Sequence, residues 1–283
     1  MVLCAGFFRE HSERDFLLPR HRDILLHNAV KDLSAERDVL AIYLAGSLAK
    51  GNFDDYSDID LHTVVIPERK ADYLKGKMKR ATGWGNAFFH EDHHPSSAYI
   101  VTHYDTFVKV DSWYHSPEEV VPSIWIKGIE ILYDPFTIMS QVVEASADYV
   151  YQPSAEEVER WRGKLLAFIH ETYRSVMREE RLYARANLDK IRWLIVLGWY
   201  MEMGEHLDGP YGAWTKIEGK RSKLEQKKLN LLNKWGSDRN CHEIMKTMRV
   251  MIPEIIRLNA CLSSLMDIEP NEDQMKKIIK MAT

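Results

Sequence analysis

Apolar residues are distributed differently in the two halves of the chain. In the first half they form short continuous runs over residues 39–45 and 59–66, which end at Gly46 and before Pro67. Runs of this length that are partly β-branched and closed by Gly or Pro are typical of buried strands. We therefore expect the first half to be built around a β-sheet.

Further strands are expected in the same half over about residues 99–103, 107–113 and 129–133, because each run is apolar or alternating and bounded by turn residues. Ahead of the first strand, apolar positions spaced among charges predict a short amphipathic helix over about residues 19–31. The pattern of the first half is that of an α/β domain with a mixed sheet.

The second half has a helical pattern from its start. Ser154 is followed by Glu157 at the spacing of a capping box, and apolar residues then recur at steps of three and four as far as Val176. A second helix is expected over about residues 182–206, and more helices should follow to the C-terminus. No strand is expected after about residue 135.

Composition limits the classes of function. The chain has 283 residues, of which 45% are hydrophobic, enough for a buried core. Because its formal net charge is -4, the chain lacks the excess of Lys and Arg that binding of a long nucleic acid requires.

Cysteine usage and the N-terminal sequence bear on location. Cys4, Cys241 and Cys261 are odd in number and lack CxxC spacing, which favours reduced thiols over a disulfide framework or a zinc site. The apolar stretch over residues 2–8 is too short for a secretory signal or a membrane span. We expect a cytoplasmic protein that is not inserted in a membrane.

A candidate phosphate loop follows the first strand. Gly46 lets the backbone turn without a Cβ, so that phosphate oxygens can approach main-chain N–H groups, and Ser47 adds a hydroxyl donor. A helix starting here would favour a triphosphate through its unpaired N–H groups and its positive end. Lys50 is close enough in sequence to help neutralise a triphosphate, although a solvated loop Lys fits equally well.

Two carboxylates follow on the next strand. Asp58 and Asp60 are two residues apart, so both side chains leave the same face of an extended chain. Neighbouring carboxylates repel unless a cation holds them, and Mg²⁺ commonly bridges protein carboxylates to substrate phosphates. The alternative interpretation is a polar turn followed by a solvated strand face.

Asp111 is a candidate third acid. Period-two alternation over residues 107–113 places Lys109, Asp111 and Trp113 on one face. An Asp inside a strand is unfavourable for folding, which hints at a function. An exposed edge-strand acid is the plainer alternative.

Together these residues resemble a known family. Gly46 and Ser47, ten further residues, then Asp58 and Asp60 with the later strand Asp111, resemble the nucleotidyltransferase superfamily, which includes DNA polymerase beta. The residues around the Gly-Ser pair and around the two strand acids are most similar to the aminoglycoside and lincosamide nucleotidyltransferase branch. The resemblance assigns phosphate binding to the Gly-Ser pair, metal binding to the two strand acids, and the role of metal ligand or base to the third acid.

The resemblance also implies an organisation and a reaction. It implies a nucleotidyltransferase catalytic domain over residues 1–150 and a helical substrate-binding domain over residues 151–283. The enzyme would use Mg²⁺ to move a nucleotide monophosphate, AMP from ATP, onto a hydroxyl of a small molecule, and would release pyrophosphate. An aminoglycoside-like antibiotic is one acceptor of this class. The resemblance leaves the acceptor and the oligomeric state open.

Three other functions stay open from the sequence. The first is transfer of the nucleotide to a protein side chain, and the second is a catalytically silent nucleotide-binding or regulatory module. Retention of all three acids argues against the second. A polynucleotide polymerase is the third, and the acidic balance of the chain disfavours it.

Two further groups of residues have a structural and a functional interpretation. The histidine cluster of residues 90–94 lacks the spacing of a metal site and is expected to form a polar loop. Aromatic residues of the second half either fill a core or line a ligand pocket; they are Trp193, Trp199, Tyr200, Tyr211 and Trp214.

Overall fold

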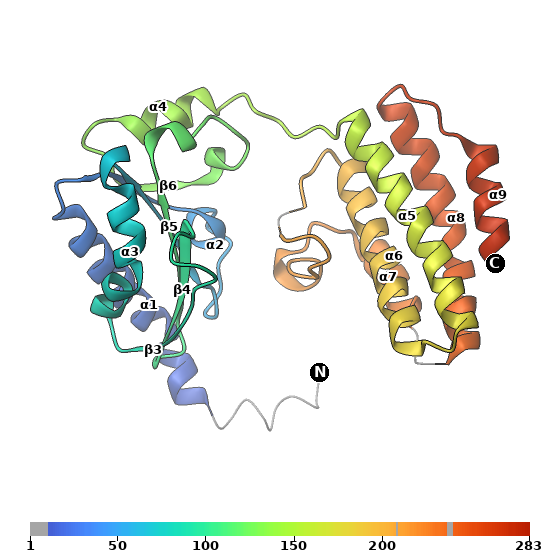
Figure 1. Cartoon of the computed structure of the whole chain (residues 1–283), viewed down its shortest axis with the longest axis horizontal. Coiled ribbons are helices and arrows are strands. Elements are labelled where there is room, and N and C mark those ends of the chain that lie inside the picture. The colour runs from blue at the N-terminus through green and yellow to red at the C-terminus, as the bar shows by residue number, and fades with distance from the viewer. Residues whose placement is uncertain (1–10, 208, 237–239) are drawn as a thin grey trace. The chain divides into compact units, whose positions relative to one another are not determined.

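The computed structural model describes residues 11–207, 209–236 and 240–283. The chain divides into two compact units, Met1–Val150 and Tyr151–Thr283 (Figure 1). The first unit contains a sheet with helices, and the part of the second unit that is described contains helices and no strand. The expected mixed sheet followed by a helical region is confirmed.

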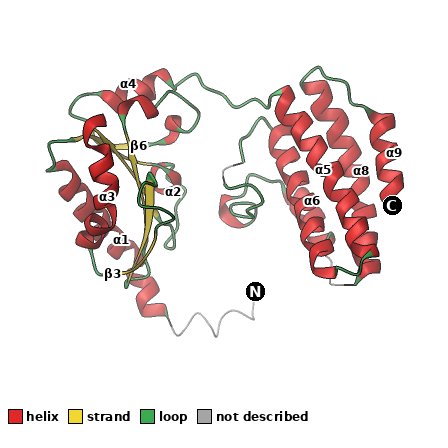
Figure 2. Ribbon diagram, in the orientation of Figure 1, coloured by secondary structure: helices red, strands yellow, loops and turns green. Residues whose placement is uncertain are grey.

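The sheet of the first unit is drawn in yellow in Figure 2. It has six strands among the described residues, in the order β3-β4-β5-β2-β1-β6. Its strands are β1 (Val39–Leu44), β2 (Ile59–Val65), β3 (Ala87–Glu91), β4 (Tyr99–Tyr104), β5 (Lys109–His115) and β6 (Glu130–Tyr133). The central pair β2 and β5 is parallel, whereas the other neighbouring pairs are antiparallel. This parallel pair later places the candidate acids side by side.

Helices cover the two faces of the sheet unequally. On one face, α1 (Ser12–Ser34) and α3 (Pro67–Trp84) pack against apolar strand residues such as Ile59 and Leu61. On the other face, α4 (Ile138–Ala145) packs near β1 around Ala41 and Met139. The side chains that alternate with Ile59 and Leu61 along β2 therefore leave the sheet opposite α1 and α3.

Short helices complete the first unit. They are α2 (Gly46–Ala49) and the 3₁₀ helices η2 (Pro117–Glu119) and η3 (Ile126–Gly128). None of the helices in the described part of the chain is long and apolar enough to cross a membrane.

The second unit is a helical bundle. Its helices are α5 (Ala155–Met177), α6 (Arg181–Glu202), α7 (Gln226–Lys234), α8 (Cys241–Leu265) and α9 (Glu272–Ala282), with the 3₁₀ helix η4 (Gly219–Arg221). The expected capping box is present, because the Ser154 hydroxyl accepts from the Glu157 N–H and the Glu157 carboxylate accepts from the Ser154 N–H. The buried indoles of Trp161 and Trp199 lie in the core that the bundle encloses.

Several element boundaries differ from the sequence prediction. Helix α1 begins at Ser12 and includes Pro19, which the amphipathic pattern had placed at its start. Helix α6 ends at Glu202 rather than near residue 206, because Gly204 adopts a left-handed φ of 66° just beyond it. Strand β5 begins at Lys109 because Phe107, at φ 66°, belongs to the preceding turn.

Helices α3 and α4 and strand β3 were not predicted from the sequence. As a consequence, the expected polar loop of residues 90–94 is partly wrong, since His90 and Glu91 end strand β3. Most β3 side chains are half or fully exposed, so the strand lacks the apolar run by which the other strands were predicted. Its exposed position follows from its place at the edge of the sheet.

Candidate active site

The loop after β1 turns sharply at Gly46. The Ala45 N–H donates to the Asp60 carbonyl at 3.0 Å, and Gly46 then adopts a φ of 65°, which favours glycine. The short helix α2 follows at once. The loop is therefore tied to the strand that carries the candidate metal ligands.

Gly46 also lies in direct contact with the carboxylate of Asp60. A Cβ at position 46 would lie 1.7 Å from Oδ2 of Asp60 and 2.8 Å from its Cγ. Such distances are far below van der Waals contact, so the position admits no side chain while Asp60 keeps its place. Glycine is thus needed here for two reasons, its backbone angle and the space that Asp60 occupies.

Ser47 is buried beside this turn. Its side chain is 4% exposed, and its hydroxyl oxygen has no hydrogen-bond partner in the described part of the protein. Buried hydroxyls are normally satisfied, and an orphaned one is costly unless a ligand or water completes it. The position of Ser47 therefore suits a ligand that brings a hydrogen-bonding atom to the loop.

The three acids meet at one place on the sheet. Asp58 directly precedes β2, and Asp60 lies on β2 opposite Asp111 of the parallel strand β5. One ligand oxygen from each of the three acids lies within 4.8 Å of those of the other two. No other group of three or more metal-ligating side chains occurs among the described residues.

The loop before Asp58 is held by an arginine that the sequence analysis overlooked. Arg22 of α1 is 4% exposed and donates to the Asp54 carbonyl at 2.8 Å. The Asp54 carboxylate in turn accepts from the Tyr56 N–H, as expected for an Asp in a turn. Helix α1 thus fixes the chain just before the first acid, a contact between distant residues that no local pattern reveals.

Lys109 joins the acids. Its ammonium lies 2.8 Å from Oδ2 of Asp58 and 3.1 Å from Oδ2 of Asp111. The sequence placed Lys109 on the same face as Asp111 but gave it no role. In the protein alone, this ammonium supplies the cation that neighbouring carboxylates need.

The electrostatics of Lys109 and Asp111 follow from this arrangement. Burial raises the pKa of Asp111, and the charge of Lys109 offsets only part of the effect. Burial lowers the pKa of Lys109, but the hydrogen bond to Asp58 and the charge of Asp111 together raise it above its ordinary value. Lys109 is therefore charged at neutral pH.

The residues present fit a divalent cation of the Mg²⁺ type. The donors are carboxylate oxygens, which hard cations prefer. Asp111 Oδ1 is buried and has no hydrogen-bond partner among the described residues, so a ligand for it is missing from the protein itself. The acidic cluster could thus hold a metal ion next to a loop that offers the Ser47 hydroxyl.

Replacing Lys109 by Met is expected to destabilise the metal-free protein and to increase the stabilisation given by Mg²⁺. Without the ammonium, Asp58 and Asp111 repel each other, and we expect a loss of about 1 to 2 kcal/mol for these partly exposed groups. Mg²⁺ then no longer competes with Lys109. The thermal midpoint, measured with chelator and with Mg²⁺, tests both effects.

Lys70 provides the matched control for this prediction. It also forms an ion pair in the first unit, with Glu119. Lys70→Met should lower the midpoint without enlarging the shift caused by Mg²⁺. Equal Mg²⁺ shifts in the wild type and in Lys109→Met would contradict competition between the lysine and the metal.

Asp111→Asn is expected to become more stable relative to the wild type as pH rises. Because burial raises the pKa of Asp111 in the folded state, its contribution to stability is present below the unfolded pKa and is lost as pH rises through the folded pKa. Asparagine does not titrate and avoids this loss. Denaturant unfolding with chelator, from about pH 3 to about pH 7, measures the difference. A difference that stays constant over this range would contradict the raised pKa.

The other residues singled out in the sequence have varied positions. Lys50 follows α2 and is exposed, and its aliphatic carbons face Gly128. Its contact with phosphate stays a prediction. His94 lies in a loop held by Lys77, which donates to the His94 carbonyl at 2.9 Å.

The aromatic residues of the helical unit fall into two classes. Trp193, Trp199 and Tyr200 are buried in the core, whereas Tyr211 and Trp214 are 59% and 40% exposed. The last two lie in the connection after α6, where they remain available to a ligand.

Comparison with known proteins supports the identity of the first unit. Residues 26–95 match the family model described as a nucleotidyltransferase domain. This segment contains Gly46, Ser47, Asp58 and Asp60, whereas Asp111 lies beyond it. No curated protein matches the chain.

Two solved structures are similar to the chain at low identity. An aminoglycoside 6-adenyltransferase from Bacillus subtilis is 12% identical with a TM-score of 0.42, over 89% of this chain and 96% of that one. A nucleotidyltransferase-like protein from Exiguobacterium sibiricum is 11% identical with a TM-score of 0.43, over 83% and 75%.

Because both TM-scores are low, neither structure supports a function for this chain. The family match and the residues within it are the remaining findings. What the comparisons show is the similarity of residues 26–95 to a nucleotidyltransferase domain.

Proposed function

We propose that this protein is a Mg²⁺-dependent enzyme that transfers AMP from ATP to a hydroxyl of a small molecule. The observation that carries the proposal is the meeting of Asp58, Asp60 and Asp111 beside the Gly46 turn, within 4.8 Å of one another. Nucleotidyl transfer needs this combination, since the charge of the triphosphate must be neutralised where the attacking hydroxyl is activated.

Each residue has a distinct task in the proposed reaction. Gly46 lets the backbone turn and leaves room for the Asp60 carboxylate, and the orphaned Ser47 hydroxyl donates to a phosphate oxygen. Asp58 and Asp60 would hold the metal ion, which would supply a Lewis acid beside the phosphate loop. The acceptor is a small molecule rather than a long nucleic acid, because the chain has a net charge of -4.

Asp111 is the proton acceptor in this proposal. Its buried Oδ1 lacks a partner, and burial raises its pKa toward the range in which a carboxylate accepts a proton more readily. A metal ion held by Asp58 and Asp60 would compete with the Lys109 ammonium for the Asp58 carboxylate. The flexible side chain of Lys109 could then pair with a phosphate oxygen of the triphosphate.

The test is pyrophosphate release from each nucleoside triphosphate with Mg²⁺, measured against a panel of hydroxyl-bearing antibiotics and metabolites. Asp58→Asn serves as the inactive control. Release that requires one acceptor and disappears in the variant would support the proposal and identify the acceptor. If Asp58→Asn is folded and turns over like the wild type, the proposal is wrong.

Transfer of the nucleotide to a protein side chain would be detected by a second assay. Incubation with labelled ATP and cell lysate would then place the label in protein bands and leave small molecules unlabelled. That outcome would retain the metal site but contradict a small-molecule acceptor.

A further inference from the structure

Asp58, unlike the other two acids, lies outside the β-ladder. Asp60 and Asp111 lie opposite each other in it, whereas the ladder between β2 and β5 begins at Ile59, one residue after Asp58. Residues beyond the end of a ladder lack the backbone hydrogen bonds that hold its interior. The position of Asp58 therefore depends on the turn before it.

Tyr56 ties this turn to helix α1. Its side chain is 60% exposed, but its hydroxyl donates to Oδ2 of Asp15 at 2.7 Å. Asp15 belongs to the first turn of α1, far from Tyr56 in the sequence. Because a hydrogen bond to a carboxylate is stronger than one between neutral groups, this contact restrains the side chain two residues before Asp58.

The other oxygen of the Asp15 carboxylate leads to the segment before Lys109. Oδ1 of Asp15 accepts from Nη2 of Arg14 at 2.7 Å, and the Arg14 guanidinium lies over the Phe107 ring, 4.1 Å from its centre. A guanidinium at this distance from an aromatic face is attracted to it. Phe107 closes the turn before β5, two residues ahead of Lys109.

Phe107 has an unusual conformation for its residue type. Its φ of 66° lies in the left-handed region, and its side chain is 62% exposed. A bulky residue is rare in this region, and strained positions of this kind concentrate at functional sites. Packing in the core therefore does not account for a phenylalanine here, whereas its contact with Arg14 does.

We propose that the start of α1 positions Asp58 and Lys109 through a clasp of four side chains. The clasp consists of Tyr56, Asp15, Arg14 and Phe107. It joins the turn before Asp58 to the turn before Lys109, and these two residues pair with each other at 2.8 Å. By restraining Asp58, the clasp keeps its carboxylate in place for a divalent cation, a role that rests on the proposed function.

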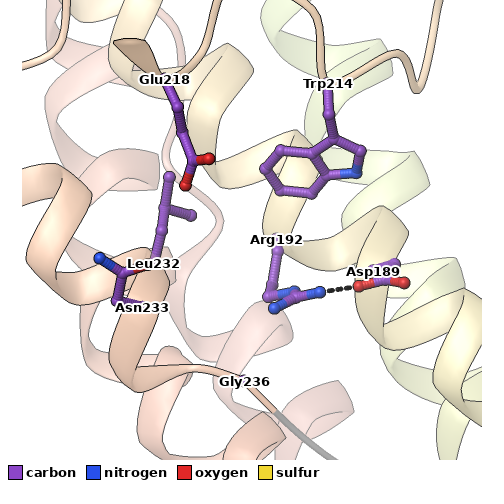
Figure 3. A pocket seen from close by; sticks show the side chains of 7 residues that line it. All are labelled: Asp189, Arg192, Trp214, Glu218, Leu232, Asn233 and Gly236. Atoms are coloured by element: carbon purple, nitrogen blue, oxygen red, sulfur yellow. Dashed lines mark hydrogen bonds and ion pairs between the residues drawn. The ribbon is translucent and has the colours of Figure 1, made fainter. Parts of the chain in front are cut away.

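The helical unit contains a similar contact that serves as a comparison. Figure 3 shows Arg192 paired with Asp189, and the Arg192 guanidinium lies 5.7 Å from the centre of a Trp214 ring. There the arginine and the aspartate belong to α6, and the ring belongs to the connection after it. This arginine–aromatic contact therefore joins two segments that carry none of the three acids.

The first test is a Mg²⁺ titration of the full chain, labelled with ¹⁵N and followed by NMR without nucleotide. Tyr56→Phe removes only the hydroxyl that Asp15 binds. It should weaken Mg²⁺ binding roughly tenfold, the lower end of what the loss of an outer contact costs a metal site. Tyr149→Phe is the matched control, because this tyrosine of the first unit is also exposed, at 48%, and it should leave Mg²⁺ binding unchanged.

Phe107→Leu tests the other end of the clasp. Leucine keeps a side chain in the same left-handed backbone, so that only the ring contact with Arg14 is lost. This variant should also weaken Mg²⁺ binding, whereas Phe107→Tyr, which keeps the ring, should bind as the wild type does. Trp214→Leu removes the comparable ring of the helical unit and should have no effect on Mg²⁺ binding.

Neither Tyr56→Phe nor Phe107→Leu changes the charge of the protein, so a long-range electrostatic effect on Mg²⁺ is avoided. Because the clasp is partly exposed, thermal midpoints with chelator should change little and show that both variants are folded. Wild-type affinity for Mg²⁺ in both folded variants would overturn the proposal.

A second measurement needs no metal. With chelator, Lys109→Met should lower the thermal midpoint less in the Tyr56→Phe background than in the wild type, because an ion pair that is no longer held in place contributes less stability. Lys70→Met should lower it equally in both backgrounds. If the wild type binds no Mg²⁺, the proposed function fails and this measurement alone decides on the clasp. Equal effects of Lys109→Met in the two backgrounds would then contradict it.

Discussion

Replacement of Asp60 by Asn is expected to lower nucleotidyl transfer about 10³-fold or more while the protein stays folded. Asp60 lies between the Gly46 turn and Asp111, so its charge acts on both the phosphate loop and the third acid. A metal ion that stabilises the charge of the transition state contributes several kcal/mol, and each 1.36 kcal/mol corresponds to about a tenfold change in rate. The measurement is kcat/KM for pyrophosphate release with Mg²⁺.

Stability should not explain this loss. Asparagine matches the shape of aspartate, and removing one of three neighbouring negative charges relieves repulsion. Asp72→Asn is the matched control, because Asp72 is exposed on α3 and pairs with the exposed Arg69 and Lys75. It should leave kcat/KM unchanged. Turnover by Asp60→Asn within tenfold of the wild type would remove Asp60 from the proposed catalytic role.

The part of the site that is local in sequence could be predicted. Gly46 and Asp60 are joined by one short connection, so a turn followed by a strand brings them together whatever the rest of the chain does. The position of Asp111 depends on the parallel register of β2 and β5, which pairs it with Asp60 across many intervening residues. The unfavourable place of Asp111 in a strand and the family resemblance indicated it as the third acid, but neither predicted the register that pairs it with Asp60.

Contacts between distant elements account for what the sequence analysis overlooked. Arg22 is an ordinary charged residue of a helix until α1 packs beside the loop and its guanidinium meets the Asp54 carbonyl. Lys109 bridges Asp58 and Asp111 through side-chain positions that depend on the same sheet register. Neither role has a spacing that a single sequence reveals.

In the helical half, too, a local feature was predicted from the sequence and a feature that depends on distant contacts was not. The capping box at Ser154 was predicted correctly because it is formed within four residues. Trp199 and Trp214 have the same residue type, yet one is buried in the core and the other is 40% exposed. That difference depends on the path of the connection after α6, which the sequence indicated only as a break.

Replacement of Gly46 by Ala is expected to be the most damaging single change of a non-acidic residue at the site. The new Cβ would lie 1.7 Å from Oδ2 of Asp60, so the carboxylate must move. Displacing a reacting or metal-holding group by about 1 Å costs about 10²-fold in rate. We expect kcat/KM to fall by at least that factor.

Gly51→Ala separates this steric effect from backbone strain. Gly51 has a φ of 67°, close to the 65° of Gly46, but a Cβ there would meet nothing within 4 Å. Both variants should lose about 1 to 2 kcal/mol of stability, the usual cost of a left-handed conformation for a residue with a side chain. Only Gly46→Ala should also lose turnover and Mg²⁺ binding. If both variants lose stability and keep turnover equally, contact between Gly46 and Asp60 does not hold the carboxylate in its working position.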